Sequence, residues 1–342
     1  MIKHLEKPIK ITKQNWAKDT SPLVSIDCIT YNHEDYIRDA IEGFLMQKTT
    51  FPVEILIHDD ASTDKTAKIV HEYETKYPEL IKPIYQTENQ YSKKKGIIGK
   101  LQRGRAKGKY IALCEGDDYW TNPLKLQEQV DFMEKNPGCT LCFHGFQEVD
   151  AVTGDIISIK RNDNHSRYFE MTELIVGGGD FIGTQTMLLS RNVIKDLPHF
   201  FEIAPSGDYP LVLIAKAMGN AYYINEDMAC YRINNTNSAM GRVYQSDFEE
   251  KFSRFAKTAI MLHNFNEYTS YKYNRTIKRQ ASNIVFKKFR RYRLESNFIE
   301  RIKILFKWKK LFTVKDYILS LVLILPIPAS RKQLSDIFSS KN

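Results

Sequence analysis

Short apolar runs alternate with amphipathic helical patterns over residues 22–120, and this alternation limits the fold more than any other feature of the chain. Each run is five to eight residues long, which is the length of a buried strand. The expected strands are Leu23–Thr30, Val53–His58, Ile81–Tyr85 and Tyr110–Cys114, with helices after the first two, around Ile37–Leu45 and Thr66–Tyr73. Continuously apolar strands joined by helices form a mostly parallel sheet that helices flank on both faces. The sequence therefore predicts an α/β fold.

Polar residues gather where three of these strands end. Thr30-Tyr31-Asn32 follows the first strand, Asp59-Asp60 the second, and Glu115-Gly116-Asp117-Asp118 the fourth. In parallel α/β sheets, ligands bind beyond the carboxyl ends of the strands, near a change in strand order. Three stretches that meet at one edge predict a binding site there more strongly than any one of them alone.

The stretch after the fourth strand places three carboxylates within four residues, those of Glu115, Asp117 and Asp118. Charges this close repel one another, and a hard divalent cation that carries phosphate oxygens would offset the repulsion. The alternative is a solvated acidic loop in which Asp118 or Asn122 caps the helix expected over Leu124–Glu134. The buried strand before the acids and the aromatic residues after them favour a site.

Beyond residue 120 the pattern becomes less regular. The expected elements are strands over Phe143–Val149, Thr184–Leu189, Ala221–Ile224 and Met228–Arg232, a helix over Leu211–Met218, and helix from Ser246 to about Trp308. Residues 88–107 are polar and predict a loop or a short helix. We therefore expect a loosely attached N-terminal arm (1–21), an α/β body (22–240) and a basic helical C-terminal region (241–342).

Charge is distributed unevenly along the chain. The net charge is +9, but Tyr271–Asn342 carries 18 Lys and Arg against 4 Asp and Glu, which leaves −5 on the first 270 residues. In this tail, cations interleave with aromatic and aliphatic residues, and the apolar run Tyr317–Ile327 has about half the ~20 residues that a spanning helix requires. The pattern predicts that 287–328 attaches to an anionic membrane surface. The alternatives are a helix packed on the body and a nucleic-acid surface, although no known nucleic-acid motif accompanies it.

The cysteines indicate a reducing compartment. They are Cys28, Cys114, Cys139, Cys142 and Cys230, and most lie in apolar runs where a free thiol packs as a small hydrophobe. Cys139 and Cys142 form a C-x-x-C pair, but no second pair completes a zinc site. An odd count and an N-terminus without an apolar leader predict a cytoplasmic location. The basic tail would place the protein there at the inner face of the cell membrane.

Several of these stretches together resemble the family 2 glycosyltransferases, which are nucleotide-sugar transferases of GT-A fold. The likeness rests on Val24–Asn32, Asp59–Asp64 and Gly108–Asp118, in the order that the family keeps, and on Gly207–Leu211 and Tyr231-Arg232. It covers about residues 22–236. The resemblance implies a Rossmann-like GT-A domain with a nucleotide-sugar-binding half (22–120) and an acceptor half (121–240), of the type that builds bacterial cell-surface polysaccharide.

The resemblance also implies roles for individual residues. Those implied to bind substrate are Thr30, Tyr31, Asn32, Asp59, Asp60, Ser62 and Arg103 for the donor, Trp120 for the acceptor, Gln185 at a substrate-facing strand end, and Tyr231 and Arg232 for the diphosphate. The alternatives are helix capping for Asp60 and Ser62, and core packing for Trp120. Lys100 and Arg105 are equal candidates for the place of Arg103, and each of the three could be a surface charge.

The acids take the catalytic roles in this resemblance. Glu115, Asp117 and Asp118 would hold Mn²⁺ or Mg²⁺, with Glu115 in place of the family's first Asp and with Asp118 either a further ligand or a loop-shaping acceptor. Asp208 stands where the family keeps its general base, after Gly207 where Glu is more usual. Its alternative is the N-cap of the following helix.

The sequence thus predicts a metal-dependent, inverting glycosyltransferase. It would move a sugar from a nucleoside-diphosphate sugar, with a UDP-sugar favoured, to a hydroxyl of a growing or lipid-linked cell-surface glycan, and no nucleic-acid partner is expected. The alternative class is a non-enzymatic basic adaptor for membranes or nucleic acids. A nucleotidyltransferase would require a signature rich in Gly, Arg and Lys after the first strand, which Thr30-Tyr31-Asn32-His33 does not provide.

Overall fold

The computed structural model describes residues 4–17, 19–93, 96–234, 247–292, 298–312 and 317–321. The chain divides into two compact units, Met1–Arg242 and Val243–Asn342. The boundary expected at residue 240 lies outside the described residues.

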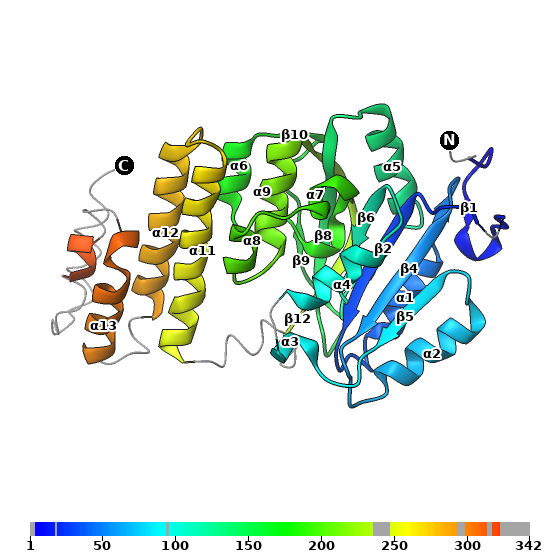
Figure 1. The fold of residues 1–342 in the computed structure, drawn as a ribbon, viewed down its shortest axis with the longest axis horizontal. Coiled ribbons are helices and arrows are strands. Elements are labelled where there is room, and N and C mark those ends of the chain that lie inside the picture. The colour runs from blue at the N-terminus through cyan, green and yellow to red at the C-terminus, as the bar shows by residue number, and fades with distance from the viewer. Residues whose placement is uncertain are drawn as a thin grey trace. The chain divides into compact units, whose positions relative to one another are not determined.

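Strands and helices alternate through the first unit (Figure 1). The strands are β1 Ile9–Lys10, β2 Val24–Thr30, β3 Lys48–Thr49, β4 Val53–Asp59, β5 Ile81–Tyr85, β6 Tyr110–Leu113, β7 Tyr119–Trp120, β8 Cys139–Asp150, β9 Ile156–Lys160, β10 Arg167–Phe169, β11 Leu188–Ser190 and β12 Asn220–Ile233. The α-helices are α1 Ile37–Leu45, α2 Thr66–Lys76, α3 Gln90–Lys93, α4 Ile97–Arg105, α5 Lys125–Lys135, α6 Met171–Gly177, α7 Arg191–Lys195, α8 Phe200–Ile203 and α9 Asp208–Met218, with 3₁₀ turns η1 Ile11–Lys13 and η2 Thr184–Thr186.

A ten-stranded sheet forms the centre of this unit, in the order β10-β12-β8-β11-β6-β2-β4-β5, with β7 paired to β12 and β9 to β8. Strands β6, β2, β4 and β5 run parallel to one another, and β8 runs parallel to β12. Strand β11 is antiparallel to both of its neighbours, β6 and β8. The predicted α/β fold and its four N-terminal strands are therefore confirmed.

Alternation along β2 explains why helices cover both faces of the sheet. Ile26 and Cys28 are fully buried in the core cluster that includes Ile41 and Phe44 of α1. Between them, Asp27 points to the opposite face, where the Gln102 side-chain amide of α4 donates to its Oδ1 at 2.7 Å. Successive side chains of a strand lie on opposite faces, so this single strand packs against helices on both sides.

The N-terminal segment is not the loosely attached arm that its polar composition suggested. Strand β1 pairs with β3, and the backbone N–H of Leu5 donates to Thr50 O at 2.7 Å. Ile11 is 1% exposed and belongs to the main core cluster. The scattered apolar residues of this polar stretch show too little periodicity to predict this packing, which depends on partners about 40 residues away in the chain.

Three expected elements differ in detail. Thr184–Thr186 forms a 3₁₀ turn and only Leu188–Ser190 is a strand. The two short strands expected between residues 221 and 232 are one strand, β12, with register shifts around Ile224 and Asp227. The polar stretch 88–107 contains two helices, α3 and α4, rather than one short helix or a loop.

The second unit is helical, as predicted. Its helices are α11 Phe248–Tyr268, α12 Asn274–Tyr292 and α13 Phe298–Trp308, followed by the 3₁₀ turn η4 Lys309–Leu311. Phe289 of α12 packs edge-on against Phe252 of α11 and against Phe312, with ring centroids 6.1 and 6.3 Å apart. Of the apolar run Tyr317–Ile327, only the part up to residue 321 lies within the described residues.

Candidate active site

The structure brings the three polar stretches to one edge of the sheet. Strands β6, β2 and β4 are consecutive and parallel, so their carboxyl ends coincide. Thr30 pairs with Asp59 in register at this edge, and Gly116 N, just beyond β6, donates to Ile29 O at 2.9 Å. The edge therefore has the position at which ligands bind in parallel α/β sheets.

The loops after β2 and β4 are held together by side chain to backbone hydrogen bonds. Asn32 N donates to Ser62 Oγ at 2.9 Å, and Thr63 N donates to Asn32 Oδ1 at 2.8 Å. Glu34 N donates to Asp64 Oδ2 at 3.0 Å. Asn32 has a φ of 55°, a left-handed conformation that Asn tolerates better than most residues. Asn32 and Ser62, which were predicted to contact the donor, thus connect the two loops. The side chain of Tyr31 is partly exposed.

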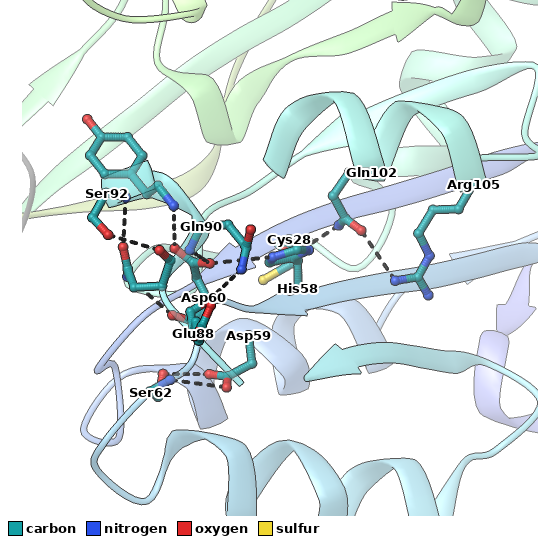
Figure 2. A network of polar contacts seen from close by, with 12 residues as sticks. Cys28, His58, Asp59, Asp60, Ser62, Glu88, Gln90, Ser92, Gln102 and Arg105 are labelled. Atoms are coloured by element: carbon teal, nitrogen blue, oxygen red, sulfur yellow. Dashed lines mark hydrogen bonds and ion pairs between the residues drawn. The ribbon is translucent and has the colours of Figure 1, made fainter. Parts of the chain in front are cut away.

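The two acids after β4 are buried and already have protein partners. Asp59 accepts hydrogen bonds from the Ser62 hydroxyl and backbone N–H, at 2.5 and 3.2 Å, and burial raises its pKa. Asp60 accepts from the backbone N–H groups of Gln90 and Tyr91 at 2.7 and 3.0 Å (Figure 2). Asp60 therefore anchors the start of α3 instead of capping α2. Ser62 does not cap α2 either.

His58 lies beside this carboxylate. Its Nε2 is 3.8 Å from Asp60 Oδ1, and its ring is fully buried (Figure 2). Burial lowers the pKa of His58, and the neighbouring Asp60 acts in the opposite direction. The predicted contact of Asp60 with a nucleotide base stays a prediction, because in this structure both of its oxygens face α3.

The acidic turn after β6 fits tightly against the end of β2. A Cβ built on Gly116 would lie 2.7 Å from Thr30 Oγ1 and 2.8 Å from Thr30 Cβ. Real Cβ atoms do not approach other heavy atoms this closely, so only glycine fits here without movement of Thr30. Thr30 is 1% exposed, and its hydroxyl has no hydrogen-bond partner among the described residues. The turn thus owes its position to the pair of Gly116 and Thr30.

Asp118 faces inward from this turn. It is 2% exposed, and its Oδ1 accepts a hydrogen bond from Arg232 N at 2.9 Å. Burial and the adjacent Asp117 raise its pKa. This position supports the loop-shaping alternative for Asp118, because one of its carboxylate oxygens already accepts from Arg232 N. Its role as a metal ligand stays a prediction.

Arg232 fixes the turn from the end of β12. Its Nη1 donates to Asp117 O at 2.8 Å, and Nη2 pairs with Asp39 of α1. The guanidinium lies between two aromatic rings, 5.0 Å from the centroid of Tyr36 and 4.5 Å from that of Tyr119. These contacts occupy the guanidinium, so a contact of Arg232 with a diphosphate stays a prediction. The sequence did not single out Tyr36 or Asp39, because they stand next to no motif.

Glu115 and Asp117 are the two acids of the turn that can hold a metal ion. Glu115 is exposed to solvent in the turn. Desolvation of its carboxyl group, then the charges of Asp117 and Asp208, raise its pKa. Asp117 has a side chain 14% exposed, with Oδ2 at 3.8 Å from His33 Nε2. No group of three Asp, Glu, His or Cys in the described part of the chain has the geometry of a complete metal site. Two carboxylates whose like charges repel each other fit a divalent cation that is also coordinated by the phosphates of the substrate.

Asp208 shares the electrostatic environment of this turn. It is the first residue of α9, whose N-cap is Gly207, so Asp208 does not occupy the N-cap position. Burial raises the pKa of Asp208, and hydrogen bonds from Ser206 and Tyr209 N act against the rise. Asp180, which follows three glycines, contributes to the same rise in pKa. The sequence did not identify Asp180, although the glycine-rich loop before it was a signal.

Tyr231 belongs to the same group of side chains. Burial raises the pKa of its phenol, and the carboxylates of Asp118, Glu115 and Asp117 add to the increase. The turn, Asp208 and Tyr231 are therefore brought together by elements that lie up to about 115 residues apart in the chain.

Three other predicted residues lie elsewhere or inside the core. Trp120 is 2% exposed, packs against Phe44 at 4.8 Å between ring centroids, and donates from Nε1 to Gln185 O at 2.9 Å. Its burial contradicts the expectation that it stacks on an acceptor sugar. Gln185 is fully buried, and both side-chain polar atoms lack a partner among the described residues. Arg103 lies over the ring of Phe201 at 5.7 Å.

Comparison with known proteins agrees with this architecture. The family model for glycosyl transferase family 2 matches residues 25–197. An uncharacterized protein of Mycobacterium tuberculosis (strain ATCC 25618 / H37Rv) is 49% identical over 123 residues, 35% of this chain and 34% of that protein. The chain thus aligns with about a third of the length of this curated relative.

Two further matches cover more of the chain. The Escherichia coli UDP-Glc:alpha-D-GlcNAc-diphosphoundecaprenol beta-1,3-glucosyltransferase WfaP is 30% identical over 191 residues, 56% of this chain and 69% of that protein. The crystal structure of S. aureus TarS 1-349 in complex with UDP-GlcNAc has a TM-score of 0.57 at 18% identity, over 79% of this chain and 72% of that one. This likeness shows that the fold is GT-A. The chain therefore belongs to glycosyl transferase family 2.

Proposed function

We propose that this protein transfers a sugar from a nucleoside-diphosphate sugar, a UDP-sugar by preference, to a hydroxyl of a cell-surface glycan, with inversion at the anomeric carbon. The observation that carries the proposal is the place of Glu115 and Asp117 in a turn at the carboxyl edge of the sheet, where Gly116 N donates to Ile29 O at the end of β2. Glu115 and Asp117 would face the donor diphosphate, and Asp208 would face the acceptor. The donor and acceptor in the name of WfaP, and the UDP-GlcNAc bound to TarS, support this class of substrates.

In this proposal Asp208 acts as the general base. Its carboxylate takes the proton of the acceptor hydroxyl while that oxygen forms a bond to the anomeric carbon, and the bond from this carbon to the diphosphate breaks. The raised pKa of Asp208 makes it a stronger base than an ordinary carboxylate. Mn²⁺ or Mg²⁺ held by Glu115 and Asp117 would supply positive charge for the leaving diphosphate. Arg232 keeps Asp117 in place by donating a hydrogen bond to the backbone carbonyl of Asp117.

Hydrolysis and transfer with a panel of nucleotide sugars test this proposal. We expect turnover that EDTA abolishes and Mn²⁺ restores, a loss of donor turnover in Asp117→Ala, and transfer at least about a hundredfold slower in Asp208→Asn. Asp196→Asn, an exposed acid at the end of α7, is the matched control and should behave as wild type. Failure to bind or hydrolyse any donor would contradict the enzyme, and normal turnover by Asp208→Asn would contradict the base assignment alone.

The second unit supports a proposal about location. On α13, Ile299 and Phe306 are 63% and 62% exposed, and Lys303 and Lys307 of the same helix are exposed as well. Large apolar side chains among exposed lysines are typical of helices that lie on anionic membranes. No helix in the described ranges is long and apolar enough to span a bilayer. We propose attachment of the protein to the inner face of the cell membrane, where a lipid-linked acceptor would be found.

A further inference from the structure

Lys125 is a buried cation at an unfavourable position. It is the first residue of α5, and its side chain is fully buried. Lysine is almost never buried completely without a charged partner, and the N-terminus of a helix repels positive charge. No carboxylate in the described part of the chain forms an ion pair with its ammonium group. A residue with this cost requires compensation from its other contacts.

Two side chains supply that compensation. Lys125 Nζ donates to Gln129 Oε1 at 2.9 Å and lies 4.1 Å from the centroid of the Trp120 ring. A cation over an indole face is a favourable electrostatic contact, and it strengthens when water is excluded. The groups around the ammonium are otherwise the thiols of Cys114 and Cys142 and the buried ring of His144. Burial lowers the pKa of Lys125 to about 7.

The same two side chains hold consecutive carbonyls of η2. Trp120 Nε1 donates to Gln185 O at 2.9 Å, and Gln129 Nε2 donates to Thr186 O at 2.9 Å. Gln129 Nε2 also donates to Cys142 O of β8 at 3.0 Å. Lys125 therefore contacts both groups that fix η2 to β7 and α5.

We infer that Lys125 is a positioning residue for the transfer reaction, because through Trp120 and Gln129 it holds η2 and the acidic turn in one arrangement. Trp120 stands two residues after Asp118, so its ring position bears on the turn. Gln185, on η2, keeps a buried side-chain amide without a partner among the described residues, and a polar substrate group is one way to satisfy such an amide. The inference rests on the proposed function, since it concerns the geometry of that site.

The test replaces the buried cation with an apolar side chain of similar length in the full chain. Lys125→Met should fold, because an apolar isostere in place of a buried charge is often neutral for stability. Its kcat should fall at least about tenfold with the donor KM unchanged within about twofold, since small misplacement of reacting groups slows chemistry strongly. Lys135→Met, an exposed lysine at the other end of α5, is the control and should have wild-type kinetics.

A spectroscopic arm separates this inference from the proposed function. In protein labelled with 5-fluorotryptophan, the ¹⁹F resonance of Trp120 is assigned by its loss in Trp120→Phe. Lys125→Met should shift this resonance, and Lys135→Met should not. A folded Lys125→Met with wild-type kcat, a kcat loss that only follows the unfolded fraction, or an unchanged Trp120 resonance would each overturn the inference. Absence of turnover in the wild-type protein would instead overturn the proposed function, and the resonance would still decide whether Lys125 sets the position of Trp120.

Discussion

At the scale of single residues, Gly116 has the most direct effect on the geometry of the acidic turn. We expect Gly116→Ala to lower the free energy of unfolding by about 1–3 kcal/mol, because the added methyl overlaps the buried Thr30 side chain. Gly104→Ala is the matched control, since no atom lies within 4 Å of the position that its methyl group would take on α4. That change should instead stabilise the protein by roughly 0.5–1 kcal/mol. Urea denaturation of both variants measures the difference, and equal effects would refute the steric argument.

Lys125 gives a pH dependence of stability with a definite sign. Its pKa in the folded protein is about 7, below the ordinary 10.5, so between these values the folded state binds fewer protons than the unfolded state. Stability therefore rises with pH through this window. Relative to Lys125→Met, the wild-type protein should gain roughly 1–2 kcal/mol between pH 7 and pH 9. Denaturation at several pH values checks this, and parallel curves for the two proteins would contradict it.

Residue types in the acidic turn could be predicted, but not the direction in which each side chain points. The spacing of Glu115, Asp117 and Asp118 is compatible with several orientations, and only the pairing of β12 with β7 turns Asp118 toward Arg232 N. Trp120 is buried for a related reason, because its ring lies against Phe44 of α1. Contacts between elements far apart in the chain leave no local signal in the sequence.

At the scale of elements, α3 depends on one carboxylate. Asp60 accepts from the first two amides of this four-residue helix, and hydrogen bonds to a charged acceptor contribute about 1.5–3 kcal/mol each. In Asp60→Ala the amides of Gln90 and Tyr91 should exchange with solvent deuterium at least about tenfold faster. Amides in the middle of α4 serve as the internal control and should keep their rates. Unchanged exchange at both positions would show that α3 does not need this anchor.

The strands and helices of the N-terminal half were predictable because β2 and β4 are apolar throughout and α1 has one regular apolar face. The 3₁₀ turn η2 was not, since Thr184–Leu189 has the composition of a strand. A strand is prevented there because Trp120 and Gln129 donate hydrogen bonds to two consecutive backbone carbonyls, those of Gln185 and Thr186. Similarly, α3 was not predictable, because it is too short to show a helical hydrophobic period. The carboxylate that fixes its first turn, Asp60, lies about 30 residues earlier in the chain.

At the scale of the whole molecule, the basic tail gives a prediction about membranes. The double variant Ile299→Ser with Phe306→Ser should bind vesicles containing phosphatidylglycerol at least about tenfold more weakly than wild type, because it loses two apolar anchors. Binding of the wild-type protein should fall as salt increases, and vesicles of phosphatidylcholine alone should bind it weakly.

A matched control for this experiment lies on β9. Ile157 is 55% exposed, and Ile157→Ser should leave vesicle binding unchanged. Equal binding of wild type and double variant to the anionic vesicles would refute attachment through α13. The sequence predicted membrane attachment from the positive charge and the interleaved apolar residues, and the structure identifies Ile299 and Phe306 as large exposed apolar side chains of α13.

During translation, the acidic turn is synthesised before Arg232, the residue that fixes it. The hydrogen bonds from Arg232 to Asp117 and Asp118 join positions 115 and 114 residues apart. At typical elongation rates, roughly ten seconds separate the synthesis of the turn from that of its partner. A nascent chain released early from the ribosome, before β12 is made, thus has the acids of the turn but not the arginine that holds them.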